Sequence, residues 1–103
     1  AFGAAGQRCM ALSVLVTVGK AREWLPELIE NAKKYQAGSG FNARSDLGPL
    51  ITPQSRDRCV DLISSAEKEG ATIALDGRDY KPEGFPNGNW VRESQTFVLT
   101  PTI

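Results

Sequence analysis

Arg8 and Cys9 stand side by side in a loop of small residues, and this pair is the part of the sequence best suited to chemistry. A thiol becomes a nucleophile when its pKa falls, and a fixed positive charge beside it favours the thiolate. The main-chain N–H of Cys9 would serve an oxyanion formed by attack on a carbonyl. Arg8 has an alternative use, because its planar guanidinium suits a substrate carboxylate.

A purely structural interpretation competes with this one. Cys9 would then be a small buried apolar side chain, Arg8 a surface charge, and the glycines before them an ordinary turn. Residue types alone favour this structural interpretation for Cys9. They favour it more strongly for Cys59, which falls on the apolar face of a predicted helix.

The composition narrows the classes of protein to which the chain can belong. It has 103 residues, 41% hydrophobic and 23% charged, which suits one small globular domain. Its 12 basic residues balance its 12 acidic ones, so no footprint for nucleic acid or an anionic membrane is visible. The lack of histidine excludes Ser-His-Asp and Cys-His catalysis within the chain, and most zinc chemistry.

The cysteine spacing and the apolar stretches exclude further classes. Two widely separated cysteines suggest neither a metal site nor a disulfide framework, and are typical of thiols in a reducing compartment. The longest apolar stretch, residues 11–18, is too short to span a bilayer.

The elements that would position the Arg8–Cys9 loop follow from the hydrophobic pattern. The β-branched residues 12–18 predict a buried strand. Residues 21–35 predict a helix that begins near Glu23, because Pro26 is tolerated only in its first turn. An apolar stripe recurs along it at helical spacing: Leu25, Leu28, Ile29, Ala32 and Tyr35.

A second helix and a short strand follow a polar connector. Thr52 is a typical N-cap and Pro53 suits the first helical position. Residues 55–69 continue this helix, with one apolar face made by Cys59, Leu62, Ile63 and Ala66. Beyond it we predict strands at 71–75, 90–91 and 96–99 and a loop at 78–89. The order strand, helix, helix, strand indicates an α/β fold, and strands so few and short need a larger sheet.

Residues 2–11 and three segments downstream of them resemble, in order, the aldehyde dehydrogenase superfamily. The sequence Gly-Gln-Arg-Cys-Met-Ala is similar to the branch of CoA-acylating methylmalonate-semialdehyde dehydrogenases. The downstream segments are Trp-Leu-Pro-Glu-Leu at 24–28, Asp-Leu-Gly-Pro-Leu-Ile-Thr-Pro at 46–53, and Glu-Gly-Ala with Asp-Gly-Arg within 69–78. The resemblance covers residues 1–91 and implies a partial catalytic domain, a strand–helix–helix–strand piece of a larger sheet.

The resemblance implies a reaction and roles for two residues. This branch oxidises malonate and methylmalonate semialdehydes to acetyl-CoA and propionyl-CoA with NAD and CoA, in valine and pyrimidine catabolism. Cys9 matches the catalytic thiolate that carries the thioacyl intermediate, and Arg8 matches a position that contacts the substrate carboxylate. We expect the NAD and CoA sites to lie outside this chain, which has no Gly-x-Gly-x-x-Gly loop. The implied enzyme is a homo-oligomer, expected to be a tetramer, in the mitochondrial matrix of a eukaryote or the cytoplasm of a bacterium.

The last twelve residues depart from the family's pattern. After Val91 the family continues with Gly-Pro-Thr-Ile, whereas Arg92 to Thr100 intervene here before Pro-Thr-Ile. We therefore predict that residues 1–91 are a fragment of the catalytic domain and residues 92–103 a divergent C-terminal tail. We expect the 103 residues alone to be inactive, because the cofactor sites are not among them. The alternative is an inactive truncated isoform that binds full-length subunits through uncovered apolar faces.

Overall fold

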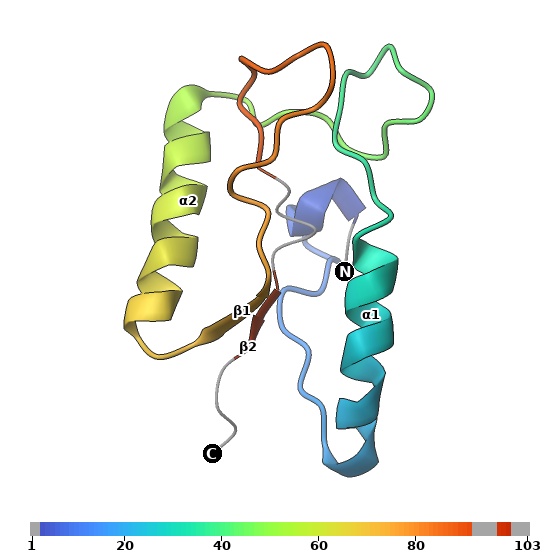
Figure 1. The fold of residues 1–103 in the computed structure, drawn as a ribbon, viewed down its shortest axis with the longest axis vertical. Coiled ribbons are helices and arrows are strands. Elements are labelled where there is room, and N and C mark those ends of the chain that lie inside the picture. Colours follow the sequence, from blue (N-terminus) through green and yellow to red (C-terminus); the bar gives the residue numbers. More distant parts are fainter. Residues whose placement is uncertain (1–2, 92–96, 100–103) are drawn as a thin grey trace.

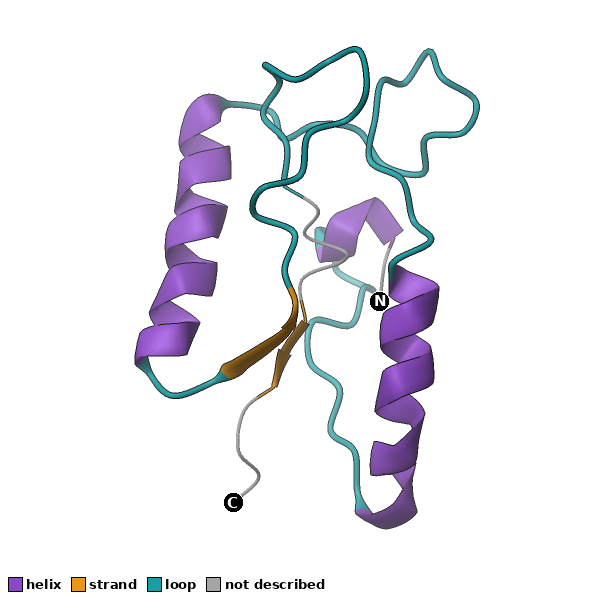
Figure 2. Ribbon diagram, in the orientation of Figure 1, coloured by secondary structure: helices purple, strands orange, loops and turns teal. Residues whose placement is uncertain are grey.

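The computed structural model describes residues 3–91 and 97–99, so most of the predicted tail at 92–103 lies outside the described residues (Figure 1). In chain order the elements are the 3-10 helices η1 (Gly3–Gly6) and η2 (Gly19–Trp24), the α-helices α1 (Leu25–Ala32) and α2 (Pro53–Lys68), and the strands β1 (Thr72–Leu75) and β2 (Phe97–Leu99). The two α-helices flank the molecule, and the strand pair and η1 lie between them (Figure 2).

Helix α1 is shorter than the predicted helix over residues 21–35, because the chain winds more tightly at both ends. Gly19, with a φ of 59°, opens the 3-10 helix η2, and Pro26 sits in the first turn of α1 as expected. After Ala32 the chain tightens again, and the N–H of Tyr35 donates to the carbonyl of Ala32 at 3.2 Å. The predicted stripe is confirmed: Ala32 is fully buried, and the other four members are half-buried.

Helix α2 begins and ends where its capping residues predict. The hydroxyl oxygen of Thr52 accepts a hydrogen bond from the N–H of Ser55 at 3.1 Å, and Pro53 follows at the start of the helix. At the other end Gly70 takes a φ of 89°. The N–H of Ala71 donates to the carbonyl of Ala66 at 3.0 Å, which satisfies a carbonyl of the last turn.

Strand β1 pairs antiparallel with β2 and confirms the strands predicted near residues 71–75 and 96–99. The register places Thr72 opposite Leu99 and Leu75 opposite Phe97. An irregularity interrupts the pairing between Ile73 and Leu75. The two strands form a small ribbon beside α2, close to the centre of the molecule (Figure 2).

Residues 12–18, predicted as a buried strand, form a loop that pairs with no strand in the described part of the chain (Figure 2). Their apolar side chains are exposed, with 67% of Leu12, 76% of Val16 and 78% of Val18 accessible. β-branched residues favour an extended backbone, but a strand also needs a neighbour to pair its N–H and C=O groups. The prediction is therefore wrong on both pairing and burial.

The buried core is small and lies where the loop after β1 meets the segment after α1. In residues 3–91 the buried apolar side chains are Ala32, Ala37, Pro82, Trp90 and Val91. The hydroxyl of Tyr80 donates to the carbonyl of Ala37 at 2.7 Å, which ties the two segments together. Residues 90–91 are thus buried, but they form no strand, contrary to prediction.

Candidate functional site

The loop that carries Arg8 and Cys9 begins with a left-handed turn. Ala4 has φ 48° and ψ 44°, Ala5 has φ 55° and ψ 30°, and Gly6 has φ 84°. The N–H of Gln7 donates to the carbonyl of Ala4 at 3.0 Å and closes this turn. The left-handed region costs an L-residue roughly 1–2 kcal/mol, so the two alanines hold a strained backbone.

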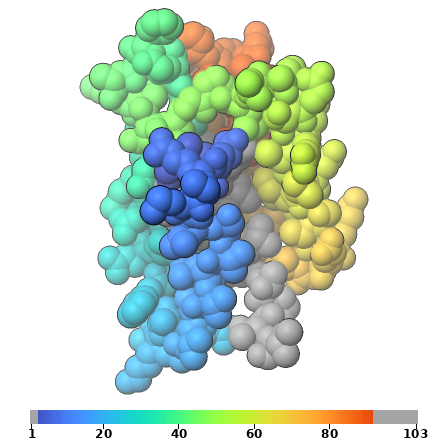
Figure 3. Space-filling model, turned by 180° about the vertical axis from the view of Figure 1, so that it is seen from behind, coloured from blue at the N-terminus to red at the C-terminus, as the bar shows by residue number. Residues whose placement is uncertain are grey.

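A second turn places Cys9 at the surface. The N–H of Ala11 donates to the carbonyl of Arg8 at 2.9 Å, which leaves Cys9 and Met10 as the central residues. Both side chains are exposed, and 91% of Met10 is accessible. Figure 3 shows the N-terminal segment spread over one face of the molecule, between the atoms of α1 and those of α2. The thiol of Cys9 is therefore open to a reactant, as nucleophilic attack requires.

The side chain of Arg8 folds back over the start of the loop. The side chain passes near Gly3, because a Cβ added there would lie 3.8 Å from both Cδ and Nη1 of Arg8. Arg8 is exposed, so its guanidinium remains available to an anion. The structure thus holds both residues of the predicted site in one exposed loop.

Cys59 lies elsewhere, on helix α2, where it is half-buried. It falls on the face predicted to be apolar, although 58% of its neighbour Leu62 is exposed. No residue of α2 is fully buried, so the predicted core setting of Cys59 is not borne out, although Cys59 is less exposed than Cys9.

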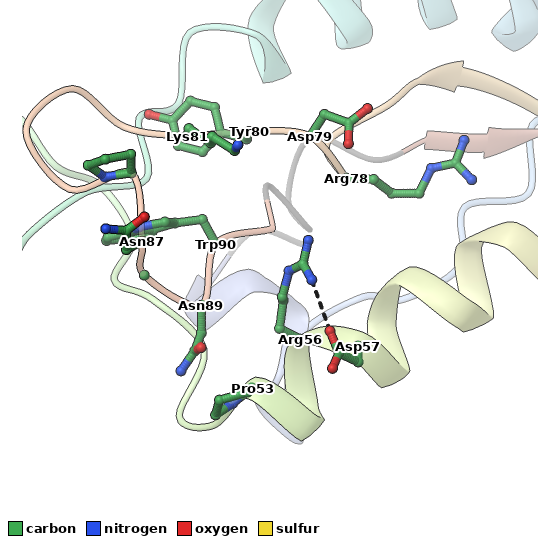
Figure 4. A pocket seen from close by; sticks show the side chains of 12 residues that line it. Pro53, Arg56, Asp57, Arg78, Asp79, Tyr80, Lys81, Asn87, Asn89 and Trp90 are labelled. Carbon is green, nitrogen blue, oxygen red and sulfur yellow. Dashed lines mark hydrogen bonds and ion pairs between the residues drawn. The ribbon is translucent and has the colours of Figure 1, made fainter.

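A cavity of about 490 Å³ lies between the first turn of α2 and the loop after β1 (Figure 4). Trp90 forms one wall, and its Nε1–H donates to the carbonyl of Phe85 at 2.5 Å. Arg56 rises from α2 into the space and pairs with Asp57 at 2.9 Å. No residue of the 3–11 loop lines this cavity. Sequence reasoning did not predict the cavity, because it depends on how a turn-rich loop folds back onto α2.

Arg78 ties the end of α2 to the segment after β1. Its guanidinium pairs with Glu67 at 2.8 Å and with Asp76 at 2.5 Å, and it donates to the hydroxyl of Ser64 at 3.0 Å. The hydrogen bond with Arg78 lowers the pKa of Asp76, and the same bond raises the pKa of Arg78 above its already high value. These groups brace the fold and lie outside the 3–11 loop.

Two further findings concern the described residues alone. They contain no group of three or more histidine, cysteine, aspartate or glutamate side chains arranged to hold a metal ion. None of their helices combines the length and the apolar character needed to cross a membrane.

Comparison with known proteins decides the family. Residues 1–97 match the model of the aldehyde dehydrogenase family. The chain belongs to this family. The resemblance predicted from residues 2–11 and the downstream segments is therefore confirmed. So is the fold class, a partial α/β domain of an aldehyde dehydrogenase.

Relatives within the aldehyde dehydrogenase family come from the branch that the loop sequence indicates. The mitochondrial acylating methylmalonate-semialdehyde/malonate-semialdehyde dehydrogenase of Bos taurus is 59% identical over 91 residues, which are 88% of this chain and 17% of the relative. The enzyme of the same name from Rattus norvegicus is 59% identical over 103 residues, which are 100% of this chain and 19% of that relative. This chain thus spans less than a fifth of either relative.

Solved structures agree with these relatives. A methylmalonate-semialdehyde dehydrogenase from Oceanimonas doudoroffii has a TM-score of 0.80 at 40% identity, over 87% of this chain and 19% of that one. A structure described as a methylmalonate-semialdehyde dehydrogenase from Sinorhizobium meliloti, complexed with NAD, has a TM-score of 0.81 at 36% identity, over the same shares. The predicted boundary at residue 91 and the roles of Arg8 and Cys9 stay predictions.

Proposed function

We propose that this chain supplies the nucleophile loop of an oxidoreductase that converts malonate or methylmalonate semialdehyde to an acyl-CoA. The observation that carries the proposal is the exposed turn that presents Cys9 beside Arg8, in a chain 59% identical to acylating semialdehyde dehydrogenases. Aldehyde dehydrogenase family membership and the printed names of these relatives support the reaction class.

Cys9 is the nucleophile in this proposal. Its thiolate attacks the aldehyde carbon, the carbonyl π electrons move to oxygen, and a thiohemiacetal forms on sulfur. The main-chain N–H of Cys9 stabilises the oxyanion. Departure of a hydride from the same carbon leaves a thioester on Cys9. A thiol acceptor then takes the acyl group and returns the Cys9 thiolate. The carboxylate of the substrate leaves as carbon dioxide, and the carbon that carried it takes up a proton, which balances the proton that the thiol acceptor gives up.

Arg8 binds the substrate carboxylate in this proposal. A semialdehyde of this class carries one carboxylate close to its aldehyde carbon, so a cation beside the nucleophile orients the substrate. The guanidinium donates paired hydrogen bonds to both carboxylate oxygens, a geometry that lysine cannot reproduce.

NAD and CoA are the proposed hydride acceptor and acyl acceptor. The NAD complex of the Sinorhizobium meliloti structure supports the first, and the word acylating in the names of the curated relatives supports the second. The described residues offer no glycine-rich nucleotide loop, since Gly3 and Gly6 stand in a left-handed turn and precede no helix of length. We therefore assign no residue of this chain to either group.

In this proposal the location follows the names of the relatives, and the assembly follows the family resemblance. The names of the mammalian relatives place them in mitochondria, so we propose a mitochondrial, matrix location if the source is eukaryotic, and the cytoplasm if it is bacterial. We propose a homotetramer as the assembly in which the loop acts. Its small-molecule partner is the semialdehyde, and neither nucleic acid nor membrane is part of the proposal.

A second candidate function is an inactive chain that binds full-length subunits. The observation that favours it is the exposed apolar surface of residues 12–18, where Val14 is 78% accessible and Leu15 is 64% accessible. Co-purification of the tagged chain with the bovine relative would support it. A folded monomer that ignores that relative would exclude it.

The experiment for the first function uses a chimera, because this chain spans 17% of the bovine relative. Residues 1–91 replace the 91 matching residues of that enzyme, and NADH formation from malonate semialdehyde and CoA is followed at 340 nm. Cys9→Ala should abolish turnover, whereas the control Cys59→Ala should retain most of it. A Cys9→Ala chimera that still turns over would contradict the role of Cys9.

A further inference from the structure

We propose that the left-handed turn at Ala4 and Ala5 is a positioning element for Arg8 and Cys9, and that the site needs the backbone conformation of these alanines rather than their methyl groups. The inference rests on the proposed function, because that function gives the Arg8–Cys9 pair its task. It goes beyond that function in assigning a role to residues that touch neither substrate nor cofactor.

The turn brings the start of the loop close to the Arg8 side chain. Consecutive left-handed residues reverse the chain, and the bond from the N–H of Gln7 to the carbonyl of Ala4, at 3.0 Å, closes the reversal. The reversal brings Gly3 near the side chain of Arg8, because a Cβ added to Gly3 would lie 3.8 Å from Cδ and from Nη1. If Ala4 and Ala5 relaxed to the right-handed region, residue 3 would leave this position and the Arg8 side chain would lose this neighbour.

Burial does not explain why Ala4 and Ala5 adopt positive φ. Ala4 is exposed and Ala5 is half-buried, so little is gained by hiding their methyl groups. Among residues 3–91 and 97–99 they are the two non-glycine residues with positive φ. Strained backbone of this kind persists where the surrounding structure requires it, and it gathers at functional sites. Here it lies four and five residues before the proposed nucleophile.

The conformation and the methyl group can be separated by substitution. Glycine adopts positive φ without cost, so Ala5→Gly keeps the turn and removes the methyl group. Valine is β-branched and a genuine outlier at positive φ, so Ala5→Val opposes the turn. Ala43→Val is the matched control, because Ala43 is an exposed loop alanine without positive φ.

The readout is the reactivity of Cys9 in the chain as it exists. Iodoacetate is negatively charged and iodoacetamide is neutral, so the ratio of their alkylation rate constants reports a cation held beside the thiol. Peptide mass spectrometry resolves Cys9 from Cys59, and measurements from pH 7 to pH 10 separate charge steering from a change in thiolate fraction. For one charge acting through water we expect the ratio at Cys9 to exceed that of a small neutral thiol by about three- to fivefold. The small thiol is the reference because Cys59 has Arg58 as its own neighbour.

We expect Ala5→Gly and Ala43→Val to keep this preference and Ala5→Val to lose it. An unchanged rate at half-buried Cys59 shows that a variant is folded. If Ala5→Val does not fold, the double variant Ala4→Gly with Ala5→Gly decides. Retention of the preference supports the proposal, and loss overturns it. The proposal is also overturned if a folded Ala5→Val variant keeps the preference for iodoacetate at Cys9, or if the unsubstituted chain shows no such preference.

Arg8→Gln distinguishes this inference from the proposed function. If Arg8→Gln removes the preference and folded Ala5→Val does not, the turn is dispensable while the role of Arg8 stands. If the preference is present but survives Arg8→Gln, Arg8 is not the cation beside Cys9, and both the proposed role of Arg8 and its positioning by the turn fail.

Discussion

Gly88 lies directly beneath the indole of Trp90, so a single added methyl group should destabilise the small core. A Cβ on Gly88 would lie 2.5 Å from Cε2 of Trp90, and closer still to Nε1, which is well inside contact distance. Trp90 is only 5% exposed, and its Nε1–H is bonded to the carbonyl of Phe85 at 2.5 Å, so the ring cannot move without loss. Gly88→Ala therefore forces the indole away from this position.

The expected cost follows from two terms. Overpacking a filled site costs about 1–3 kcal/mol. Losing the hydrogen bond from Trp90 to Phe85 adds about 1 kcal/mol. The sum is about 2–4 kcal/mol, a large share of the roughly 5–15 kcal/mol that holds a domain of this kind together. The melting temperature should fall by roughly 4–8 °C for each kcal/mol.

Urea unfolding followed by circular dichroism at 222 nm measures this cost, and Gly40→Ala is its control. Gly40 has no atom within 4 Å of an added Cβ and no positive φ, so its substitution should change the free energy of unfolding by less than about 0.5 kcal/mol. If Gly88→Ala is as stable as Gly40→Ala, then the indole does not pack on Gly88 and the described core is wrong.

Three further predictions concern the groups that brace the fold. Thr52→Ala removes the cap of α2 and should cost about 1 kcal/mol in urea unfolding. Tyr80→Phe removes the 2.7 Å bond to the carbonyl of Ala37 and should cost about 1 kcal/mol in the same assay. The pKa of Asp76 is lowered by Arg78, so Asp76 contributes stability above its unfolded pKa, and the contribution is lost as pH falls through the lower folded pKa. Asp76→Asn should therefore lower the melting temperature at pH 7 and flatten its fall between pH 5 and pH 2.

Each of these predictions has a result that would contradict it. Gln54→Ala, an exposed change in the first turn of α2, is the control for Thr52→Ala, and equal stabilities would exclude capping by Thr52. Unchanged stability in Tyr80→Phe would show that the bond from the Tyr80 hydroxyl to the carbonyl of Ala37 adds nothing to stability. If the melting temperatures of Asp76→Asn and of the unsubstituted chain fall in parallel from pH 5 to pH 2, then the ion pair with Arg78 does not stabilise the fold.

The helices could be predicted from sequence because their signals are local. Thr52 and Pro53 mark the start of α2 and Gly70 marks its end, and each signal lies within two residues of the helix terminus that it sets. The stripe on α1 is also a local pattern, and its burial follows the predicted face. Only the ends of α1 differ, since 3-10 winding after Gly19 is not encoded in hydrophobic spacing.

The loop at residues 12–18 was wrongly predicted as a strand, because strand pairing depends on residues far away in the sequence. Its residues favour an extended backbone, but nothing in their pattern says whether a neighbouring strand is present. The cavity beside Trp90 was missed for a similar reason, since it joins α2 to a loop more than twenty positions downstream. The Arg8–Cys9 loop was found because both residues are adjacent in sequence. The left-handed backbone of Ala4 and Ala5 was not predicted, because alanine carries no signal for positive φ.

Trapping the acyl group on the chain tests the central claim most directly. The chimera described above is mixed with malonate semialdehyde and NAD in the absence of CoA, quenched in acid, digested and analysed by mass spectrometry. We predict an acyl adduct, labile to hydroxylamine, on the peptide that contains Cys9, and none in Cys9→Ser. An adduct confined to the peptide that contains Cys59, or turnover by Cys9→Ser without any adduct, would contradict the assignment of Cys9 as the nucleophile.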